Sequence, residues 1–375
     1  MHIPPTKVVF DRPARREILS RVEDILKTGL LSQGRNVEEF EREWARVTGS
    51  RHAVAVNSGS SAIEVSMRIL GIKGREVLVP VNTFAATAVS VLMAGGNVRF
   101  VDIDPETFSI SLKNLKRRVT SRTRGVVIVH IAGIISPEIN LIRSWCSRNG
   151  LWLFEDCAHA HGSELRGRHA GTFGVAGGYS FFATKVITSG EGGMIVTNSR
   201  AFADHARLLR NHGKPEPWVS YHTDIGSNWR MSELHAAVGL AHLKRLDRSI
   251  ARREKLAGIY TKLLGGIPGL VPVLPASKCS WYKYIVLLPG GVDRKALKDS
   301  LREKGVNLPG EVYDLPLHRQ PVFKGNASGI FPAAEDVCSR HICLPLYDGM
   351  TEKEAAFVAA NLRNAFIHRN RRVKL

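Results

Sequence analysis

The sequence predicts an α/β protein with a mostly parallel sheet, followed by a smaller α+β domain. Short apolar runs rich in branched residues alternate with helical patterns through the first 245 residues. These runs are almost continuously apolar, which is typical of parallel strands that are covered by helices on both faces. Beyond residue 245, a long basic helical stretch and several prolines replace the alternation.

The first 245 residues supply most of the predicted elements. Residues 38–47 predict an amphipathic helix, because Phe40, Trp44 and Val47 recur at helical spacing. Small polar residues then precede a second predicted helix at 62–70. The predicted strands, each bounded by turn residues, are residues 53–56, 77–80, 98–101, 126–129, 151–154 and 194–197.

The rest of the chain predicts fewer strands and more helix. Residues 237–264 read as one long basic helix, which ends before the prolines at 268, 272 and 275. A strand is predicted at 282–288, and helices are predicted at 294–304 and 352–366. We therefore predict a large domain over residues 1–245 and a small C-terminal α+β domain over residues 246–375.

Composition excludes several classes of protein. Hydrophobic residues make up 44% and charged residues 23% of the chain, which is a globular balance and excludes a disordered chain. No apolar run of about 18 residues occurs, and the N-terminus lacks an apolar signal core, so we expect no membrane partner. The cysteines form no CxxC pair, so we expect buried, reduced thiols, no metal site and a cytoplasmic location.

The chain is strongly basic, with 53 Lys and Arg against 34 Asp and Glu and a formal net charge of +19. Such an excess suits either nucleic acid or anionic small molecules. The basic residues are scattered through predicted helices without interleaved aromatic residues, and the dense run at 369–375 predicts a solvated tail. We therefore expect no nucleic-acid partner.

Small and polar residues follow several predicted strands, where ligands of open α/β sheets bind. Residues 57–61 are suited to a phosphate at a helix N-terminus, although a plain serine cap is an alternative. Asp156 follows a predicted buried strand, where a carboxylate is costly to bury unless it meets a cationic partner, such as a protonated ring nitrogen. Capping of the following helix by Asp156 is the alternative. His159 and His161 lack further residues at metal-ligand spacing.

Lys185 lies between an apolar stretch and a glycine-rich turn. If the lysine is partly buried, its pKa falls, and the neutral amine can form a Schiff base with a carbonyl. A solvated surface lysine is the alternative reading. Ser180 lies five residues upstream and is placed to offer a hydroxyl to a phosphate, whereas the spacing within residues 226–233 says little about their role.

Six segments in consistent order resemble the DegT/DnrJ/EryC1/StrS sugar aminotransferases. They are NSGSSAI at 57–63, NTFAATA at 82–88, FEDCAHAHGS at 154–163, YSFFATK at 179–185, GEGGMIVT at 190–197 and GSNWRMSELHAAVGL at 226–240. The resemblance covers most of the chain, from about residue 34 to beyond residue 318. It implies the type I, aspartate aminotransferase-like fold and pyridoxal 5′-phosphate (PLP) as the cofactor.

The resemblance also implies roles for individual residues. Lys185 would hold PLP as an internal aldimine and then shuttle protons, and Asp156 would pair with the pyridine nitrogen. The other implied cofactor contacts are Phe84 on the ring, Gly59, Ser60 and Ser180 at the phosphate, and His159 near O3′. Asn228 would reach the cofactor phosphate of a neighbouring subunit, which implies a homodimer with shared active sites.

Two of these positions depart from the common family pattern. Position 159 is commonly Gln and is His here, and an imidazole can still donate a hydrogen bond. Position 60 is often Thr and is Ser here, which keeps the hydroxyl.

The resemblance implies transfer of an amino group from glutamate or glutamine, through pyridoxamine phosphate, to a keto sugar that is usually nucleotide-linked. A cyclitol or another non-nucleotide ketone is an alternative acceptor. Related dehydratases carry His where this chain has Lys185, so the lysine favours transamination. A regulator on the same fold is a further alternative, but too few residues precede the first predicted helix for a DNA-binding domain.

Four further residues are weaker substrate candidates. Tyr313 and His318 lie in a region where family members meet their substrate. His130 follows a predicted strand and is expected to face the same cleft, and Arg210 is placed in a turn where it could meet a substrate anion. For each of these four residues, a structural role without substrate contact is the alternative interpretation.

Overall fold

The apolar runs of the first 200 residues form one seven-stranded sheet in the computed structural model, which describes residues 1–216 and 218–372. The strand order is β1-β9-β8-β5-β4-β2-β3, and β9 alone runs against the other six. The strands are β1 (His52–Val56), β2 (Glu76–Pro80), β3 (Asn97–Val101), β4 (Thr123–Val129), β5 (Trp152–Asp156), β8 (Ala176–Ser180) and β9 (Gly193–Thr197). The predicted α/β class with a mostly parallel sheet is confirmed.

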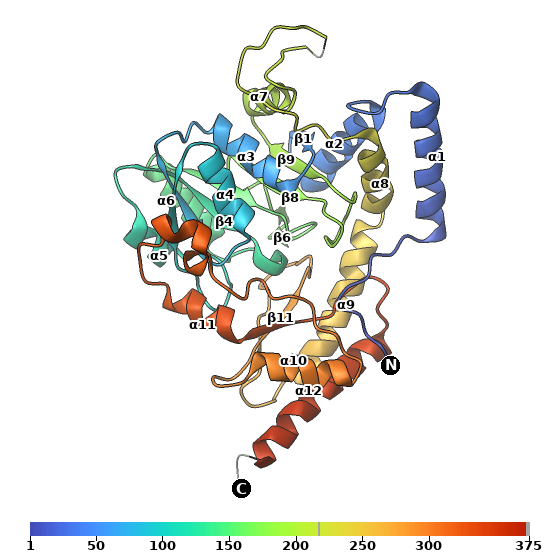
Figure 1. Cartoon of the computed structure of the whole chain (residues 1–375), viewed down its shortest axis with the longest axis vertical. Helices are drawn as coiled ribbons and strands as arrows, with labels where there is room; N and C mark the ends of the chain where they lie inside the picture. The colour runs from blue at the N-terminus through green and yellow to red at the C-terminus, as the bar shows by residue number, and fades with distance from the viewer. Residues whose placement is uncertain (217, 373–375) are drawn as a thin grey trace.

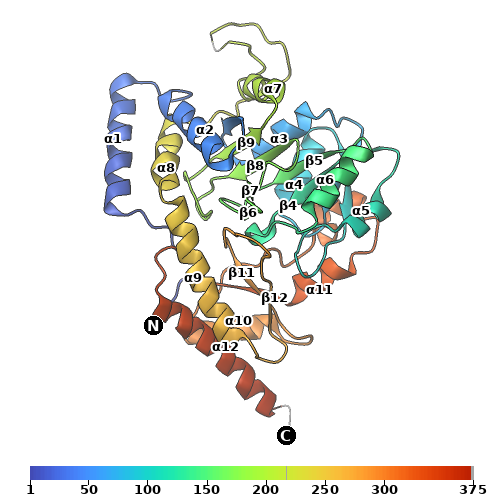
Figure 2. The ribbon, with the colours of Figure 1, turned by 180° about the vertical axis from the view of Figure 1, so that it is seen from behind.

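Helices cover both faces of this sheet (Figures 1 and 2). One face packs against α3, α4 and α7 in a core that includes Val65, Val91 and Ala206. The opposite face packs against α2, α5, α6 and α8 through residues such as Trp44 and Ile142. The bounds of these helices are α2 (Arg35–Thr48), α3 (Gly59–Ile69), α4 (Ala85–Met93), α5 (Leu112–Arg118), α6 (Ile139–Arg148), α7 (Arg200–Arg210) and α8 (Glu233–Leu243). Helix α1 (Arg12–Thr28) lies outside α8, and β6 (Glu164–Leu165) and β7 (Arg168–His169) form a short hairpin.

The C-terminal part has its own three-stranded antiparallel sheet, in the order β10-β11-β12. Its elements are α9 (Leu246–Leu264), β10 (Val271–Pro272), β11 (Tyr284–Leu287), α10 (Arg294–Glu303), α11 (Pro332–Arg340), β12 (His341–Leu344) and α12 (Glu352–Arg372). The N-terminal segment joins it, because the backbone of Ile3 exchanges hydrogen bonds with Gly305 and Asn307. The domain boundary near residue 245 stays a prediction, and the structure adds that the first residues lie beside the C-terminal sheet.

The prediction of one continuous helix over 237–264 is wrong. The hydrogen-bond ladder tightens after α8, where the amide of Arg245 donates to the carbonyl of His242, three residues back. The Arg245 side chain donates to the carbonyl of Val9 and lies 3.5 Å from an Asp11 carboxylate oxygen. Two helices result: α8 packs on α2, and most of α9 packs on α12.

Glu233, in the first turn of α8, caps a different helix. The N-cap of helix α2 is Gly34, which has no side chain that could accept hydrogen bonds from the free amides of the first turn. The Glu233 carboxylate instead accepts hydrogen bonds from the backbone amides of Gly34, Asn36 and Val37 and from the Asn36 side chain, at 2.7–2.9 Å. It is 2% exposed. The 226–240 segment therefore ties α8 to the start of α2.

We expect Glu233→Ala to lower the free energy of unfolding by about 3 kcal/mol, because it leaves several buried N–H donors without an acceptor. The midpoint of urea denaturation measures the loss. Glu43→Ala, which removes a partly exposed pair with Arg46 within α2, is the matched control and should change stability by less than about 0.5 kcal/mol. Equal effects of the two substitutions would contradict the capping role.

Three other expectations concern the surface and the thiols. All five cysteines are buried, as expected. Among the described residues, no helix is both long enough and apolar enough to cross a membrane. The basic run at 369–375 continues α12 to Arg372, and residues 373–375 lie outside the described part of the chain.

Candidate active site

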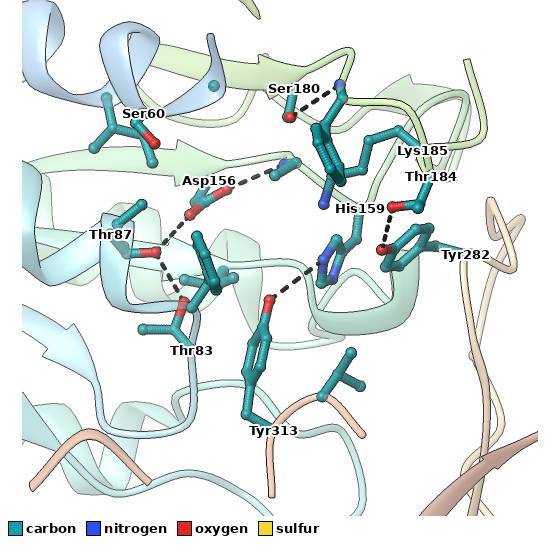
Figure 3. Close-up of a pocket in the computed structure, with 18 of the residues that line it drawn as sticks. Ser60, Thr83, Thr87, Asp156, His159, Ser180, Thr184, Lys185, Tyr282 and Tyr313 are labelled. Atoms are coloured by element: carbon teal, nitrogen blue, oxygen red, sulfur yellow. Dashed lines mark hydrogen bonds between the residues drawn. The ribbon is translucent and has the colours of Figure 1, made fainter. Parts of the chain in front are cut away.

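A cavity of about 410 Å³ opens at the carboxyl ends of the large sheet (Figure 3). Five strands contribute residues at or just beyond their ends, because parallel strands present these ends on one edge. They are Ser58–Ser60 after β1, Thr83 and Phe84 after β2, Val129 of β4, Asp156 of β5 and Ser180 of β8. Residues 310–313 form the opposite wall together with Tyr282 and Lys283, which directly precede β11.

Lys185 enters the cavity from the turn after β8, where its backbone amide donates to the carbonyl of Phe182 at 2.9 Å. Its ammonium lies 4.7 Å from the ring centroid of Tyr282. Burial lowers the pKa of Lys185 and the charge of Lys283 adds to this effect, whereas Tyr282 and Asp156 oppose it. The alternative of a solvated surface lysine is excluded, and the lowered pKa favours a reactive amine.

Asp156 ends β5 with its carboxylate in the cavity, 4% exposed. One oxygen accepts a hydrogen bond from the Thr87 hydroxyl at 2.7 Å, and the other accepts from the amide of Ala158 at 3.1 Å. Residues 157–159 form a turn, so Asp156 caps no helix. Burial raises the pKa of Asp156, and Thr87, Ala158 and Lys185 partly oppose that rise. No Lys, Arg or His nitrogen within the described ranges makes an ion pair with it, so this carboxylate suits a cationic group of a ligand.

The start of α3 and the end of β8 meet at a second part of the cavity. Ser58 caps α3 by accepting a hydrogen bond from the amide of Ser61, which confirms the simple capping role and leaves Gly59 and Ser60 facing the cavity. A Cβ at Gly59 would lie 2.6 Å from the Cβ of Ser180, so only glycine permits this approach. A helix N-terminus beside two hydroxyl side chains suits a phosphate group.

Aromatic side chains form the remaining walls. Phe84 is 60% exposed, and its ring lies 5.9 Å from that of Tyr313. His159 stacks on Tyr282 with ring centroids 4.2 Å apart. Its Nδ1 accepts a hydrogen bond from the amide of Ala132 at 3.4 Å, which leaves Nε2 to carry the proton, 3.5 Å from the Tyr313 hydroxyl. Burial lowers the pKa of His159 well below its usual value, so the ring is neutral.

Four predicted site residues do not line the cavity. His130 is fully buried, with Nε2 3.0 Å from an oxygen of Glu155, so the expectation that it faces the cleft is corrected. Its neighbour Val129 takes the position on the cavity wall. His318 lies 2.8 Å from Glu335 and packs on Phe331.

The other two lie near α7 and its following loop. Arg210 is buried, donates to the carbonyl of Ala55 at 2.8 Å and pairs with Glu41, so it is held within the fold. Asn228 is exposed, and its carbonyl accepts a hydrogen bond from the Asn57 side chain at 3.2 Å.

Three residues of the cavity escaped the sequence-based prediction. Thr87 orients Asp156 and in turn lies 2.9 Å from the Thr83 hydroxyl, within a motif that the sequence did highlight. Tyr282 and Lys283 come from the start of the C-terminal sheet. No spacing in the sequence signals their approach to Lys185.

The model of the DegT/DnrJ/EryC1/StrS aminotransferase family matches residues 13–363. The chain belongs to this family. Spore coat polysaccharide biosynthesis protein SpsC of Bacillus subtilis is 34% identical over 93% of this chain and 94% of its own length. GDP-perosamine synthase of Vibrio cholerae is 32% identical over 92% and 94%. The structure of DesI with its TDP-sugar product superposes with a TM-score of 0.89, at 30% identity, over 98% of this chain and 96% of that chain.

Members of the DegT/DnrJ/EryC1/StrS family use PLP, so the expected cofactor and enzyme class are confirmed. Escherichia coli GDP-4-keto-6-deoxy-D-mannose-3-dehydratase, solved with bound hydrated PLP, superposes with a TM-score of 0.87 at 25% identity, covering 96% of this chain and 99% of that one. These similarities also confirm the type I fold. The polar groups of the cavity fit PLP: an amine, a buried carboxylate without a paired cation, and a helix N-terminus with two hydroxyl groups line the same cavity.

Proposed function

We propose that this family member transfers an amino group from glutamate or glutamine to a keto sugar that is linked to a nucleotide. The observation that carries this proposal is that Lys185, with its lowered pKa, shares one cavity with the uncompensated carboxylate of Asp156. A nucleophilic amine and a partner for a ring nitrogen are the two groups that PLP-dependent transamination requires.

The residues of the cavity would divide the work as follows. Bound PLP supplies an electron sink for the bonds at the substrate carbon. Asp156 holds the proton on the cofactor's ring nitrogen, and Thr87 orients Asp156. The Nζ atom of Lys185 would move a proton from the donor's carbon to the cofactor carbon, and in the second half-reaction from the cofactor carbon to the acceptor's carbon, because an amine of lowered pKa acts as both base and acid. Gly59, Ser60 and Ser180 hold the phosphate.

Relatives support the choice of a sugar acceptor. The similar proteins include a GDP-perosamine synthase and DesI with a TDP-sugar product. A cyclitol or another non-nucleotide ketone remains the alternative acceptor, because the cavity walls combine aromatic, hydroxyl and charged side chains and carry no contact that belongs to a nucleotide alone. Dehydration is the second alternative, and Lys185 argues against it because related dehydratases carry His at this position.

We further propose a homodimer. Asn228 is exposed and takes no part in the cavity of its own chain, which supports a role in a partner's site. A cytoplasmic location remains a prediction, in keeping with five thiols that are all buried and unpaired.

A panel of keto substrates tests the function. The PLP-loaded enzyme is incubated with glutamate or glutamine that carries a heavy-nitrogen label, together with GDP-, UDP- and TDP-linked keto sugars and cyclitol ketones. Mass spectrometry should detect the label in an amino sugar nucleotide. Label transfer only to cyclitols would replace the proposed substrate class, and sugar dehydration without transfer would replace the reaction.

A further inference from the structure

A second cavity, of about 230 Å³, adjoins the active site beyond Tyr282 and Lys283. We call it the side chamber. Pro5 and Thr6 of the N-terminal segment, Arg253 of α9 and residues of the C-terminal sheet complete its wall. Thr184, Tyr282, Lys283 and Gly310 line both cavities, so the side chamber and the site where Lys185 acts share one wall.

The side chamber is positively charged. Lys283 and Arg253 line it, and no carboxylate does. Glu311, an acidic residue of the active-site wall, is already paired with Lys298 at 2.7 Å. Arg253 is paired with Asp348, whose carboxylate lies 3.1 Å from its Nε, whereas Lys283 has no ion pair among the described residues. One unpaired cation beside a second that keeps a free Nη2 favours an anionic ligand over a neutral one.

Both cations keep donors available. Lys283 is half-buried, and its ammonium makes no hydrogen bond or ion pair with any residue of the described ranges. Arg253 uses Nε for Asp348 and Nη1 for the carbonyls of Trp281 and Leu346. Its Nη2 donates to none of the residues that the structure describes. Burial lowers the pKa of Lys283, and the charges of Arg253 and Lys298 add to this effect, whereas Cys343 and Glu311 oppose it. A bound anion would favour the charged ammonium and so offset the cost of its burial.

The size of the side chamber restricts the ligand. A volume of 230 Å³ is below the roughly 300–1,000 Å³ of pockets that enclose a whole drug-sized molecule. It is large enough for a carboxylate or a phosphoryl group. The ammonium of Lys283 and that of Lys185 lie 5.3 and 4.7 Å from the centroid of the same Tyr282 ring, so the two nitrogens are at most about 10 Å apart and one substrate molecule can reach both.

We propose that the side chamber is an anion site, in which the ammonium of Lys283 and Nη2 of Arg253 bind a carboxylate or phosphoryl group of a substrate that reacts at Lys185. The assignment of that group to a substrate rests on the proposed function. The presence of an anion site does not, because it depends only on the charge, donors and size of the side chamber.

Binding of inorganic phosphate to the PLP-loaded enzyme tests the anion site directly. Isothermal titration calorimetry should show that Lys283→Met weakens phosphate binding by about tenfold or more, because one charge-assisted hydrogen bond is lost. Lys283→Arg should restore most of the affinity. Lys295→Met is the matched control, since Lys295 lies on α10 with its side chain 89% exposed and pairs with Asp299. Equal phosphate affinity in wild type and Lys283→Met would overturn the proposal.

Steady-state kinetics then identify the source of the anion. A raised KM for glutamate or glutamine alone, with kcat nearly unchanged, assigns the side chamber to the donor's carboxylate. A raised KM for the keto substrate alone assigns it to a phosphoryl group. Unchanged KM values for both substrates, despite weaker phosphate binding, would overturn the assignment to a substrate. Lys283-dependent phosphate binding in an enzyme that aminates no keto sugar would instead count against the proposed function.

Discussion

Lys185→Ala should abolish transamination while leaving the fold intact. We expect turnover to fall by about 10⁴-fold or more, because the positioned acid–base group and the covalent anchor of the cofactor are lost together. The near-ultraviolet and visible absorbance of lysine-bound PLP should disappear, and that of the free aldehyde form should replace it. The thermal midpoint should change little, since burial of an ammonium is itself unfavourable.

Three comparisons separate a chemical role of Lys185 from a structural one. Lys295→Ala, at an exposed position on α10, should leave both the absorbance and the turnover unchanged. An added small primary amine should restore part of the Lys185→Ala rate, because it can enter the space that the side chain leaves. Full activity of Lys185→Ala, or retention of the lysine-bound spectrum, would show that another amine carries the reaction, and Lys283 would be the first candidate.

The parts of this molecule that the sequence predicted well are those set by local pattern. Each strand predicted in the large sheet is found within about three residues of its expected bounds. Asp156 and Ser60 were singled out because they follow predicted strands, and Lys185 because it lies between an apolar stretch and a glycine-rich turn. The common direction of β1, β5 and β8 brings all three residues to one edge of the sheet. The long helix over 237–264 failed because helical periodicity continues across Arg245, where only contacts with Val9 and Asp11 mark the break.

Strand β8 was not predicted, because its sequence AGGYS lacks branched residues. The glycines are required by close packing: a Cβ at Gly177 would lie 2.4 Å from the Cα of Gly171. The need for glycine comes from contact with a segment outside the strand, so the sequence of β8 itself carries no pattern that indicates a strand.

Side-chain direction and long-range packing explain why some residues of the cavity differ from those predicted. His130 comes one residue after Val129, and only Val129 lines the cavity, since neighbouring residues at a strand end point to opposite sides. Tyr282 and Lys283 reach Lys185 from about 100 positions away in the sequence, through the packing of the C-terminal sheet. No single-sequence pattern reports that approach.

Asp156→Asn should separate catalysis from cofactor binding. We expect PLP to remain bound, because Lys185, Gly59, Ser60 and Ser180 are unchanged. Turnover should fall by about 10²–10⁴-fold, since a neutral amide cannot hold the proton on the ring nitrogen. Single-turnover kinetics with the amino donor alone should show the loss in the first half-reaction. An unchanged rate would show that Asp156 is not the partner of that nitrogen.

The same substitution should stabilise the protein without PLP, which is the opposite of its effect on catalysis. Burial raises the pKa of Asp156 in the folded state, so the folded protein binds this proton more tightly than the unfolded chain. The folded state therefore loses stability as the pH rises from about 3.9, the ordinary pKa of Asp, through the raised pKa of Asp156. Asn does not ionise, so the variant does not show this loss. The urea midpoint of apo Asp156→Asn should exceed that of the wild type at about pH 8, and the gap should close near about pH 4. A wild type that is equally stable at the higher pH would mean that the hydrogen bonds from Thr87 and Ala158 already offset the cost of burying the charge, and that the carboxylate needs no cationic ligand.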